Sequence, residues 1–285
     1  MSLPSVLKAP AGAPRDEENL HQQQPHRQNP PGGKPHDDGL REAQGEPQEA
    51  REHQLVRAFL EYLTPRSPGF FVDVGANHPW RGSQTWHLEQ RGWRGIVVEP
   101  LPEHADHLRR TRTAAVFEVA CSSPENAGKV LPFYAADVLS GLDLKQMAPS
   151  AEPCVINVPV RTLDSVLEEA GAPRPVDFVS IDVEGHEIEV LRGFDFTRWA
   201  PRLVLLEDHI ANLNRHRFMT GNGYRLVRRT GINGWYVPDA APIRFGLKDD
   251  WHVLRKYFLG LPLRKMRHRW RALFYDRAHR PHSPD

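Results

Sequence analysis

The sequence contains few of the features that mark secreted or membrane-spanning proteins. Only two cysteines occur among the 285 residues, and Cys121 and Cys154 form no Cys-x-x-Cys pair. A disulfide framework is therefore not expected, which favours a reducing compartment. No stretch approaches the ~20 consecutive apolar residues that a transmembrane helix requires, and no apolar segment follows the N-terminal lysine as it would in a signal peptide. These absences together predict a cytoplasmic protein.

Apolar and charged residues are unevenly distributed along the chain. The formal net charge of +1 argues by itself neither for nor against a nucleic-acid partner. Residues 1–50 are rich in proline, glutamine, histidine and acids but poor in aliphatic clusters, so we expect them to form a disordered tail. Residues 51–240 contain the apolar segments of a folded domain, and residues 241–285 are expected to form a basic, partly helical extension.

Strand-like and helix-like segments alternate through the expected domain. The predicted strands are Phe70–Val74, Gly95–Glu99, Ala114–Ala120, Lys129–Tyr134, Asn157–Val160, Asp177–Asp182 and Leu203–Glu207. The predicted helices are a short entry helix over Leu55–Leu63, then Ser83–Arg91, Glu103–Arg112, Leu163–Ala170 and Gly185–Arg192. Tyr224–Arg229 and Gly234–Val237 flank a Thr-Gly-Ile-Asn turn, which predicts a hairpin. The alternation indicates an α/β fold whose mostly parallel sheet is covered on both faces.

The turn after the first expected strand indicates which ligand the sheet binds. In open α/β sheets the ligand lies beyond the carboxyl ends of the strands, and here that turn is Asp73-Val74-Gly75-Ala76-Asn77. It has one glycine where a dinucleotide-binding turn has G-x-G-x-x-G, and the Asp73 carboxylate would repel a phosphate. A phosphate-free ligand with a positive centre fits better. S-adenosylmethionine, which carries a sulfonium and an ammonium, is such a ligand.

The ends of neighbouring strands supply the other expected contacts to this ligand. Glu99 ends the second expected strand, where a carboxylate suits the ribose hydroxyls, and Pro100 would give the adenine an apolar wall. The predicted cofactor contacts are Asp73, Gly75, Ala76, Asn77, Glu99, Pro100, Ala120, Cys121 and Asp182.

Acidic residues and a histidine follow two further strands at the same edge. Asp182 comes directly after Phe178–Ile181, where a carboxylate without a partner would cost desolvation energy. Glu207 and His209 follow the next strand. A hydroxyl that accepts a methyl group must lose a proton, and His209 is the first candidate for the base, with Asp182 the second. Alternatively, Asp182 and Glu207 share a Mg²⁺ that lowers the pKa of the acceptor hydroxyl.

These motifs resemble the FkbM family of S-adenosylmethionine-dependent methyltransferases. The resemblance runs from about Phe70 to Val237 and rests on FVDVGAN, VVEP, VRTLDSVL, DFVSIDVEGHEIEVLRGFD and LVLLEDH. The most specific element is the Asp-Val-Glu-Gly-x-Glu run followed by Leu-Arg-Gly. The resemblance implies a class I methyltransferase fold: a Rossmann-like, seven-stranded sheet with one antiparallel strand near its end. It also implies O-methylation, mostly of hydroxyls on sugars, glycans or natural products.

By matching positions, the resemblance implies cofactor contacts at Asp73, Gly75, Asn77 and Glu99, and a role beside the methyl group for Asp182, Glu184 and Glu187. Glu184 and Glu187 are expected in the first turn of a helix, where the helix N-terminus also favours negative charge. Both are predicted to contact the substrate, as is Ser140, whose alternative role is a plain turn. The loop His78-Pro79-Trp80-Arg81-Gly82 departs from the small, glycine-containing run of many members, so we expect the loop over the methionine end to be shaped differently.

The basic end and two rival functions complete the sequence-based predictions. Between Trp251 and Asp285, nine Lys or Arg face two Asp, and apolar residues recur there at helical spacing. Residues 251–275 are therefore expected either to contact a membrane peripherally or to dock on their own domain. One rival is a nicotinamide-dependent oxidoreductase, which Glu99 would also suit; the other is a non-catalytic protein that binds membrane or nucleic acid through this end. The expected partner is a small-molecule or glycan acceptor, not nucleic acid.

Overall fold

A computed structural model describes residues 47–64, 68–135, 154–208 and 213–243 of the chain, and a few single positions between 251 and 266. Most of the predicted tail and basic extension lies outside these described residues. Within them, no helix is both long enough and apolar enough to cross a membrane.

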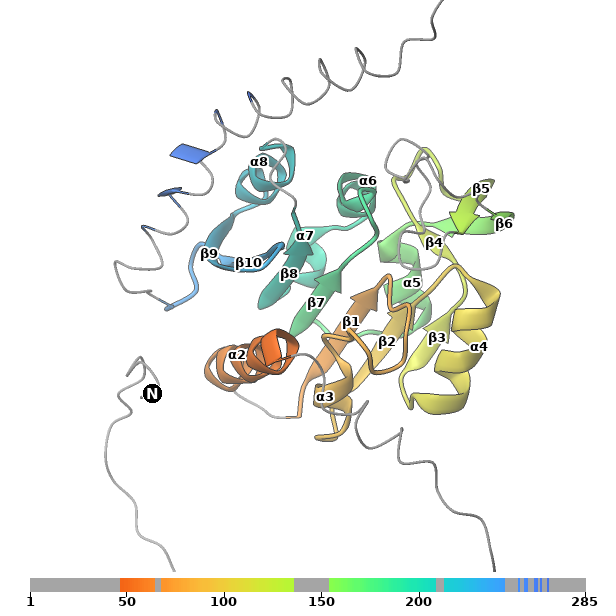
Figure 1. Ribbon diagram of the computed structural model, residues 1–285, viewed down its shortest axis with the longest axis horizontal. Coiled ribbons are helices and arrows are strands. Elements are labelled where there is room, and N and C mark those ends of the chain that lie inside the picture. The colour runs from red at the N-terminus through yellow and green to blue at the C-terminus, as the bar shows by residue number, and fades with distance from the viewer. Residues whose placement is uncertain are drawn as a thin grey trace, which may run out of the picture. The chain divides into compact units, whose positions relative to one another are not determined.

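A seven-stranded sheet forms the centre of the described domain, with the strand order β3-β2-β1-β7-β8-β10-β9 (Figure 1). Its strands are β1 (Phe70–Val74), β2 (Arg94–Val98), β3 (Ala115–Phe117), β7 (Phe178–Ile181), β8 (Leu203–Glu207), β9 (Tyr224–Thr230) and β10 (Asn233–Pro238). Neighbouring strands pair in parallel except at β10, which is antiparallel to both β8 and β9. The mostly parallel sheet with its terminal hairpin is therefore confirmed.

Helices cover both faces of this sheet, as predicted. One core cluster packs α2 (Pro47–Leu63), α3 (Trp86–Glu89) and α4 (Pro102–Thr111) against residues such as Phe71 and Val97. The other packs α5 (Leu163–Glu169), α6 (Glu187–Arg192), α7 (Phe196–Trp199) and α8 (Asn214–Gly221) against residues such as Val72 and Ile96. Because successive side chains of a strand point to opposite faces, the apolar β1 and β2 supply both clusters.

A second, three-stranded sheet has the order β4-β6-β5, and Figure 1 shows β5 and β6 set apart from the strands of the large sheet. Its strands are β4 (Ala120–Cys121), β5 (Val130–Ala135) and β6 (Cys154–Arg161). The single strand predicted over Ala114–Ala120 is wrong in this respect. The chain divides there, because β3 pairs with β2 in the large sheet whereas β4 pairs with β6 in the small one.

Two predicted helices are shorter than expected at their N-termini. The helix expected from Ser83 begins at Trp86, since the Ser83 hydroxyl accepts hydrogen bonds from the backbone N–H groups of Thr85 and Trp86. The helix expected from Gly185 begins at Glu187. Glu184 has a positive φ of 48° and precedes the helix, so its predicted place in the first helical turn is wrong, whereas that of Glu187 is correct.

Candidate functional site

A cavity of about 430 Å³ opens at the carboxyl edge of β1, β2 and β7, and this volume falls within the range typical of small-molecule sites. It is lined by three residues after each strand, by the loop that leads toward α3, and by His104 and Phe133. The lining residues are Gly75, Ala76, Asn77, His78, Arg81, Gly82, Glu99, Pro100, Leu101, His104, Phe133, Asp182, Val183 and Glu184. The cavity thus brings together most of the strand-end residues that the sequence singled out.

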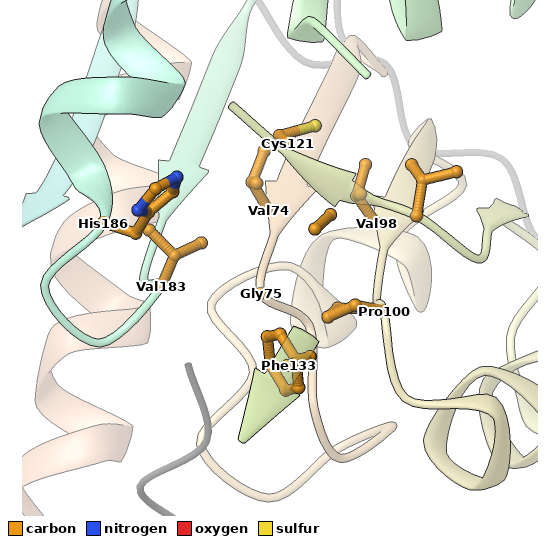
Figure 2. Close-up of a pocket in the computed structure, with 10 residues that line it drawn as sticks. Val74, Gly75, Val98, Pro100, Cys121, Phe133, Val183 and His186 are labelled. Carbon is orange, nitrogen blue, oxygen red and sulfur yellow. The ribbon is translucent and has the colours of Figure 1, made fainter. Parts of the chain in front are cut away.

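A smaller apolar recess of about 30 Å³ shares Gly75, Pro100, Phe133 and Val183 with this cavity. Figure 2 shows its wall, where His186 and Val183 approach from the segment before α6 and face Val74 and Cys121. Ala120 and Cys121, both predicted cofactor contacts, lie here. Burial raises the pKa of the Cys121 thiol to about 12, so this side chain is a neutral, apolar surface at physiological pH. The recess therefore suits the flat apolar edge of a ligand.

Gly75 allows the first turn to pass against the end of β7. Its φ is +84°, and a Cβ at this position would lie 1.8 Å from the carbonyl oxygen of Asp182. The backbone N–H groups of Gly75 and Ala76 both donate to the Val98 carbonyl, at 3.0 and 3.2 Å. Any larger residue would push β1 and β7 apart, so glycine is required by close approach as well as by conformation.

The Glu99 carboxylate is fixed at the cavity wall by backbone donors. Asn77 N–H donates to one carboxylate oxygen at 2.8 Å, and Leu101 N–H donates to the other at 2.9 Å. Burial raises the pKa of Glu99 to about 7, the two backbone hydrogen bonds oppose this rise, and the charge of Asp73 adds to it. Because a carboxylate has about four acceptor positions, Glu99 retains acceptor capacity for the hydroxyls of a bound ligand.

Asp73 lies in a buried polar network and not among the residues that line the cavity, so its direct contact with the cofactor stays a prediction. It shares a strand face with Phe71, and its carboxylate accepts a 2.6 Å hydrogen bond from the Thr85 hydroxyl. Arg112 completes the network, donating to Thr85 Oγ1 at 2.9 Å and to the Pro79 carbonyl at 3.0 Å. Burial raises the pKa of Asp73, while the Thr85 hydrogen bond and the Arg112 charge lower it. The network holds the loop that precedes α3 onto the sheet.

Three carboxyl groups converge at the ends of β7 and β8. Asp182, Glu184 and Glu207 each offer an oxygen within 4.8 Å of the other two, and Asp182 is hydrogen bonded to Glu207. Asp182 is exposed toward the cavity, whereas Glu207 is buried behind it with 2% of its surface accessible. Asp182 thus lies at the cavity wall with Glu207 behind it, so Glu207 would act on a ligand through Asp182 or through an ion held between them; the roles of both stay predictions.

The Asp182–Glu207 pair holds a proton at neutral pH. Although Asp182 is exposed toward the cavity, one of its carboxylate oxygens lies within 4.8 Å of oxygens of Glu184 and Glu207. Desolvation, followed by the charges of Glu184 and Glu187, raises the pKa of Asp182 to about 7. Desolvation and then the charge of Asp182 raise the pKa of Glu207 to about 9. Two carboxylates this close do not both ionise readily, so one proton is shared between them.

Glu187 is fully buried and turned away from the cavity lining, so its predicted direct substrate contact is not what this geometry provides. One of its oxygens accepts a 2.7 Å hydrogen bond from the Gly185 N–H, and the other accepts two from the Arg215 guanidinium. Arg215 also lies 3.9 Å from Asp208 at the end of β8. Glu187 therefore fixes the turn between β7 and α6 from behind.

Sequence reasoning missed Arg112 and Arg215, the two arginines that organise this site. Both lie far along the chain from the acids they serve, in positions 112 and 215, with no local motif to mark them. His209 and Ser140, predicted as the base and as a substrate contact, lie outside the described residues.

The strand order and the site at the carboxyl edge define a class I methyltransferase fold. The sequence model of the "Methyltransferase FkbM domain" matches residues 73–226, just over half of the chain, so the chain belongs to the FkbM methyltransferase domain family. No curated protein matches this sequence.

Several solved structures have a distantly similar fold. Precorrin-6y C5,15-methyltransferase from Geobacter metallireducens GS-15 is 12% identical over 65% of this chain and 87% of that chain, with a TM-score of 0.34. An uncharacterized protein from Listeria monocytogenes serotype 4b is 10% identical over 81% and 89%, with a TM-score of 0.38. Human methyltransferase 10 domain containing protein is 11% identical over 67% and 80%, with a TM-score of 0.35.

Proposed function

We propose that this protein is an S-adenosylmethionine-dependent O-methyltransferase that acts on a hydroxyl of a sugar, a glycan or a natural product. The observation that carries the proposal is the cavity at the carboxyl edge, whose wall contains the carboxylates of Glu99, Asp182 and Glu184 beside a turn with a single glycine. Such a wall favours a cationic, phosphate-free nucleoside over a pyrophosphate cofactor.

The residues present fit this cofactor. Glu99 is oriented by two backbone donors and would accept hydrogen bonds from the ribose hydroxyls. Pro100 and the recess at Ala120 and Cys121 would contact the adenine. Asp182 would face the cationic end. When bound, S-adenosylmethionine supplies the electrophilic methyl group.

The acidic pair supports removal of the acceptor proton. Burial and the neighbouring negative charges raise the pKa of both carboxyls, so the pair retains one proton that Glu207, the more buried member, can hold. Glu207 then donates a hydrogen bond to Asp182 and orients it, and the other Asp182 oxygen accepts the proton of the acceptor hydroxyl. His209, the first candidate for the base from the sequence, lies outside the described residues and stays a prediction. A Mg²⁺ on Asp182 and Glu207 remains the alternative activator, and activity that persists in a metal chelator would argue against it.

Calorimetry on the purified full chain tests the cofactor assignment. S-adenosylmethionine and its demethylated product, S-adenosylhomocysteine, are expected to bind, whereas NADH is not. Glu99→Gln should weaken S-adenosylhomocysteine about 10- to 100-fold through loss of charged hydrogen bonds. The matched control is Glu103→Gln, on an exposed position of α4, which should leave binding unchanged. Binding of NADH with no heat from S-adenosylhomocysteine would refute the proposal in favour of the oxidoreductase.

The acceptor class needs a separate assay, because cofactor binding does not report on it. Transfer of an isotope-labelled methyl group to a panel of sugars, lipid-linked glycans and hydroxylated natural products should give an alkali-stable ether product. Methylation confined to amines or carboxylates would contradict O-methylation of hydroxyls. We also propose a cytoplasmic enzyme with a peripheral membrane contact through residues 251–275. Failure of the full chain to float with anionic liposomes would remove that contact.

A further inference from the structure

Two neighbouring acids at the end of β8, Glu207 and Asp208, have different partners. Successive side chains along an extended chain point in opposite directions. Glu207 is hydrogen bonded to Asp182 in the acidic pair described above. Asp208 instead lies between two arginines: one of its carboxylate oxygens is 3.9 Å from Arg215 of α8, and the other is 3.9 Å from Arg229 of β9. The Glu-Asp sequence is thus divided between the acidic pair and an arginine cluster.

The Asp208 carboxylate is one member of a chain of alternating charges, which runs from Arg229 through Asp208 and Arg215 to Glu187. Arg229 also donates a hydrogen bond to the backbone carbonyl of Asp208. At the far end, one Glu187 oxygen accepts two hydrogen bonds from Arg215, and the other accepts one of 2.7 Å from the Gly185 N–H. The chain therefore connects the end of β8 to the turn between β7 and α6.

Burial makes the geometry of this chain strict. Glu187, Asp208 and Arg229 expose 0%, 1% and 8% of their surface, and the Arg215 side chain exposes 12%. A buried charge is costly unless its partners lie close to it. A displacement of Asp208 would therefore displace Arg215, and through it Glu187.

The turn that this chain holds carries the acids of the cavity wall. Asp182, Val183 and Glu184 all line the cavity and directly precede Gly185. Glu184 has a φ of 48°, a left-handed conformation that a residue other than glycine keeps only where its surroundings enforce it. The hydrogen bond from the Gly185 N–H to Glu187 is such a constraint, because it fixes the residue after Glu184.

We infer that Asp208 is a positioning residue, which acts through Arg215 and Glu187 to hold the turn that carries Asp182, so that the Asp182 carboxylate keeps a fixed position toward the ligand. The inference rests on the proposed function for the identity of that ligand. The two acids at the end of β8 then have separate tasks. Glu207 orients the Asp182 side chain directly, whereas Asp208 holds the backbone from which Asp182 projects.

Amide hydrogen exchange, measured by NMR on the full chain, tests the positioning without any ligand. The Gly185 N–H, which the charge chain holds, is compared with the Glu99 N–H, which donates to the Phe117 carbonyl at 3.0 Å on the other side of β1. Asp208→Asn should speed exchange at Gly185 about 10- to 100-fold and change that at Glu99 by no more than about twofold. Asp208→Glu keeps the charge and should lie between. Asp106→Asn, which removes an exposed acid paired with Arg109 on α4, should change neither amide.

Calorimetry with two ligands that differ by one charge tests the consequence for binding. S-adenosylmethionine carries a sulfonium where S-adenosylhomocysteine has a neutral sulfur, and the attraction between the sulfonium and the Asp182 carboxylate depends on their separation. Asp208→Asn should lower the affinity for S-adenosylmethionine relative to S-adenosylhomocysteine about 3- to 10-fold. Asp208→Glu should restore part of this preference, and Asp106→Asn should leave it unchanged.

The possible outcomes separate the inference from the proposed function. Unchanged exchange at Gly185 in Asp208→Asn would overturn the inference, and so would equal acceleration at Gly185 and Glu99, which would mean a general loss of stability. An unchanged ratio of the two affinities would overturn it as well, while the cofactor assignment would stand. If the unmodified chain binds neither ligand, the proposed function fails, and exchange at Gly185 alone decides whether Asp208 positions the turn. If Asp208→Asn does not fold, Asp208→Glu takes its place in both comparisons.

Discussion

Replacing Thr85 by valine should lower the free energy of unfolding far more than removing a hydroxyl from an exposed threonine does. Thr85 is fully buried, donates a 2.6 Å hydrogen bond to Asp73 and accepts one of 2.9 Å from Arg112. Valine has nearly the same shape, so the substitution removes both hydrogen bonds while leaving the packing almost unchanged. Two charged groups would each lose a partner in a place that water does not reach.

The magnitude follows from those two hydrogen bonds. A hydrogen bond to a charged group contributes about 1.5–3 kcal/mol. In the variant, Asp73 keeps its hydrogen bond from Ser83, and Arg112 keeps its ion pair with Glu89 and its hydrogen bond to the Pro79 carbonyl. We therefore expect a loss of about 3 kcal/mol in the free energy of unfolding, or about 6–12 °C in Tm for a domain of this size. Affinity for S-adenosylhomocysteine should fall too, since Arg112, which loses Thr85 as a partner, also holds Pro79 in the loop that lines the cavity.

Urea unfolding at pH 7, followed by circular dichroism, measures this loss. Thr220→Val is the matched control, because the Thr220 hydroxyl is exposed and donates only to carbonyls of its own helix, so its removal should cost no more than about 0.5 kcal/mol. If the two variants lose equal stability, or if Thr85→Val loses less than about 1 kcal/mol, the reasoning about a buried charged network is wrong.

Three further predictions concern the edge of the sheet. Gly75→Ala should abolish binding of S-adenosylhomocysteine and lower the Tm by several degrees, because its Cβ would collide with the Asp182 carbonyl; a soluble variant with normal affinity would contradict this. If ionised Asp182 is the base, kcat/KM should rise with pH through about 7. Glu184→Gln removes a neighbouring negative charge, which lowers the pKa of Asp182 and should move that rise to lower pH. A pH profile that does not move would exclude an effect of Glu184 on Asp182. Glu187→Gln should cost about 3 kcal/mol in urea unfolding, because the Arg215 charge loses its closest partner and keeps only Asp208 at 3.9 Å; adding Arg215→Met should recover part of the loss, and strictly additive effects would show that the pair does not interact.

Local sequence patterns alone predicted the architecture and much of the cavity. Apolar runs such as Phe178–Ile181 each ended in a polar residue, and parallel strands bring such ends to one edge of a sheet whatever the distance between them along the chain. Glu99 and Asp182 were therefore placed correctly at the cavity wall. The hairpin of β9 and β10 was equally local, because its turn residues lie between two short apolar strands.

Only the tertiary structure decided what the acids face. Asp73 and Glu187 have the same chemistry as the cavity acids, yet each meets a buried partner, through Thr85 in one case and Arg215 in the other. Those partners come from helices and loops whose docking depends on how both faces of the sheet are packed. The contact between Glu187 and Arg215 joins residues 28 positions apart, and the periods of 2 and 3.6 residues that mark strands and helices cannot predict it. Proximity at the carboxyl edge is thus a property of strand direction, whereas access to the ligand is a property of side-chain packing.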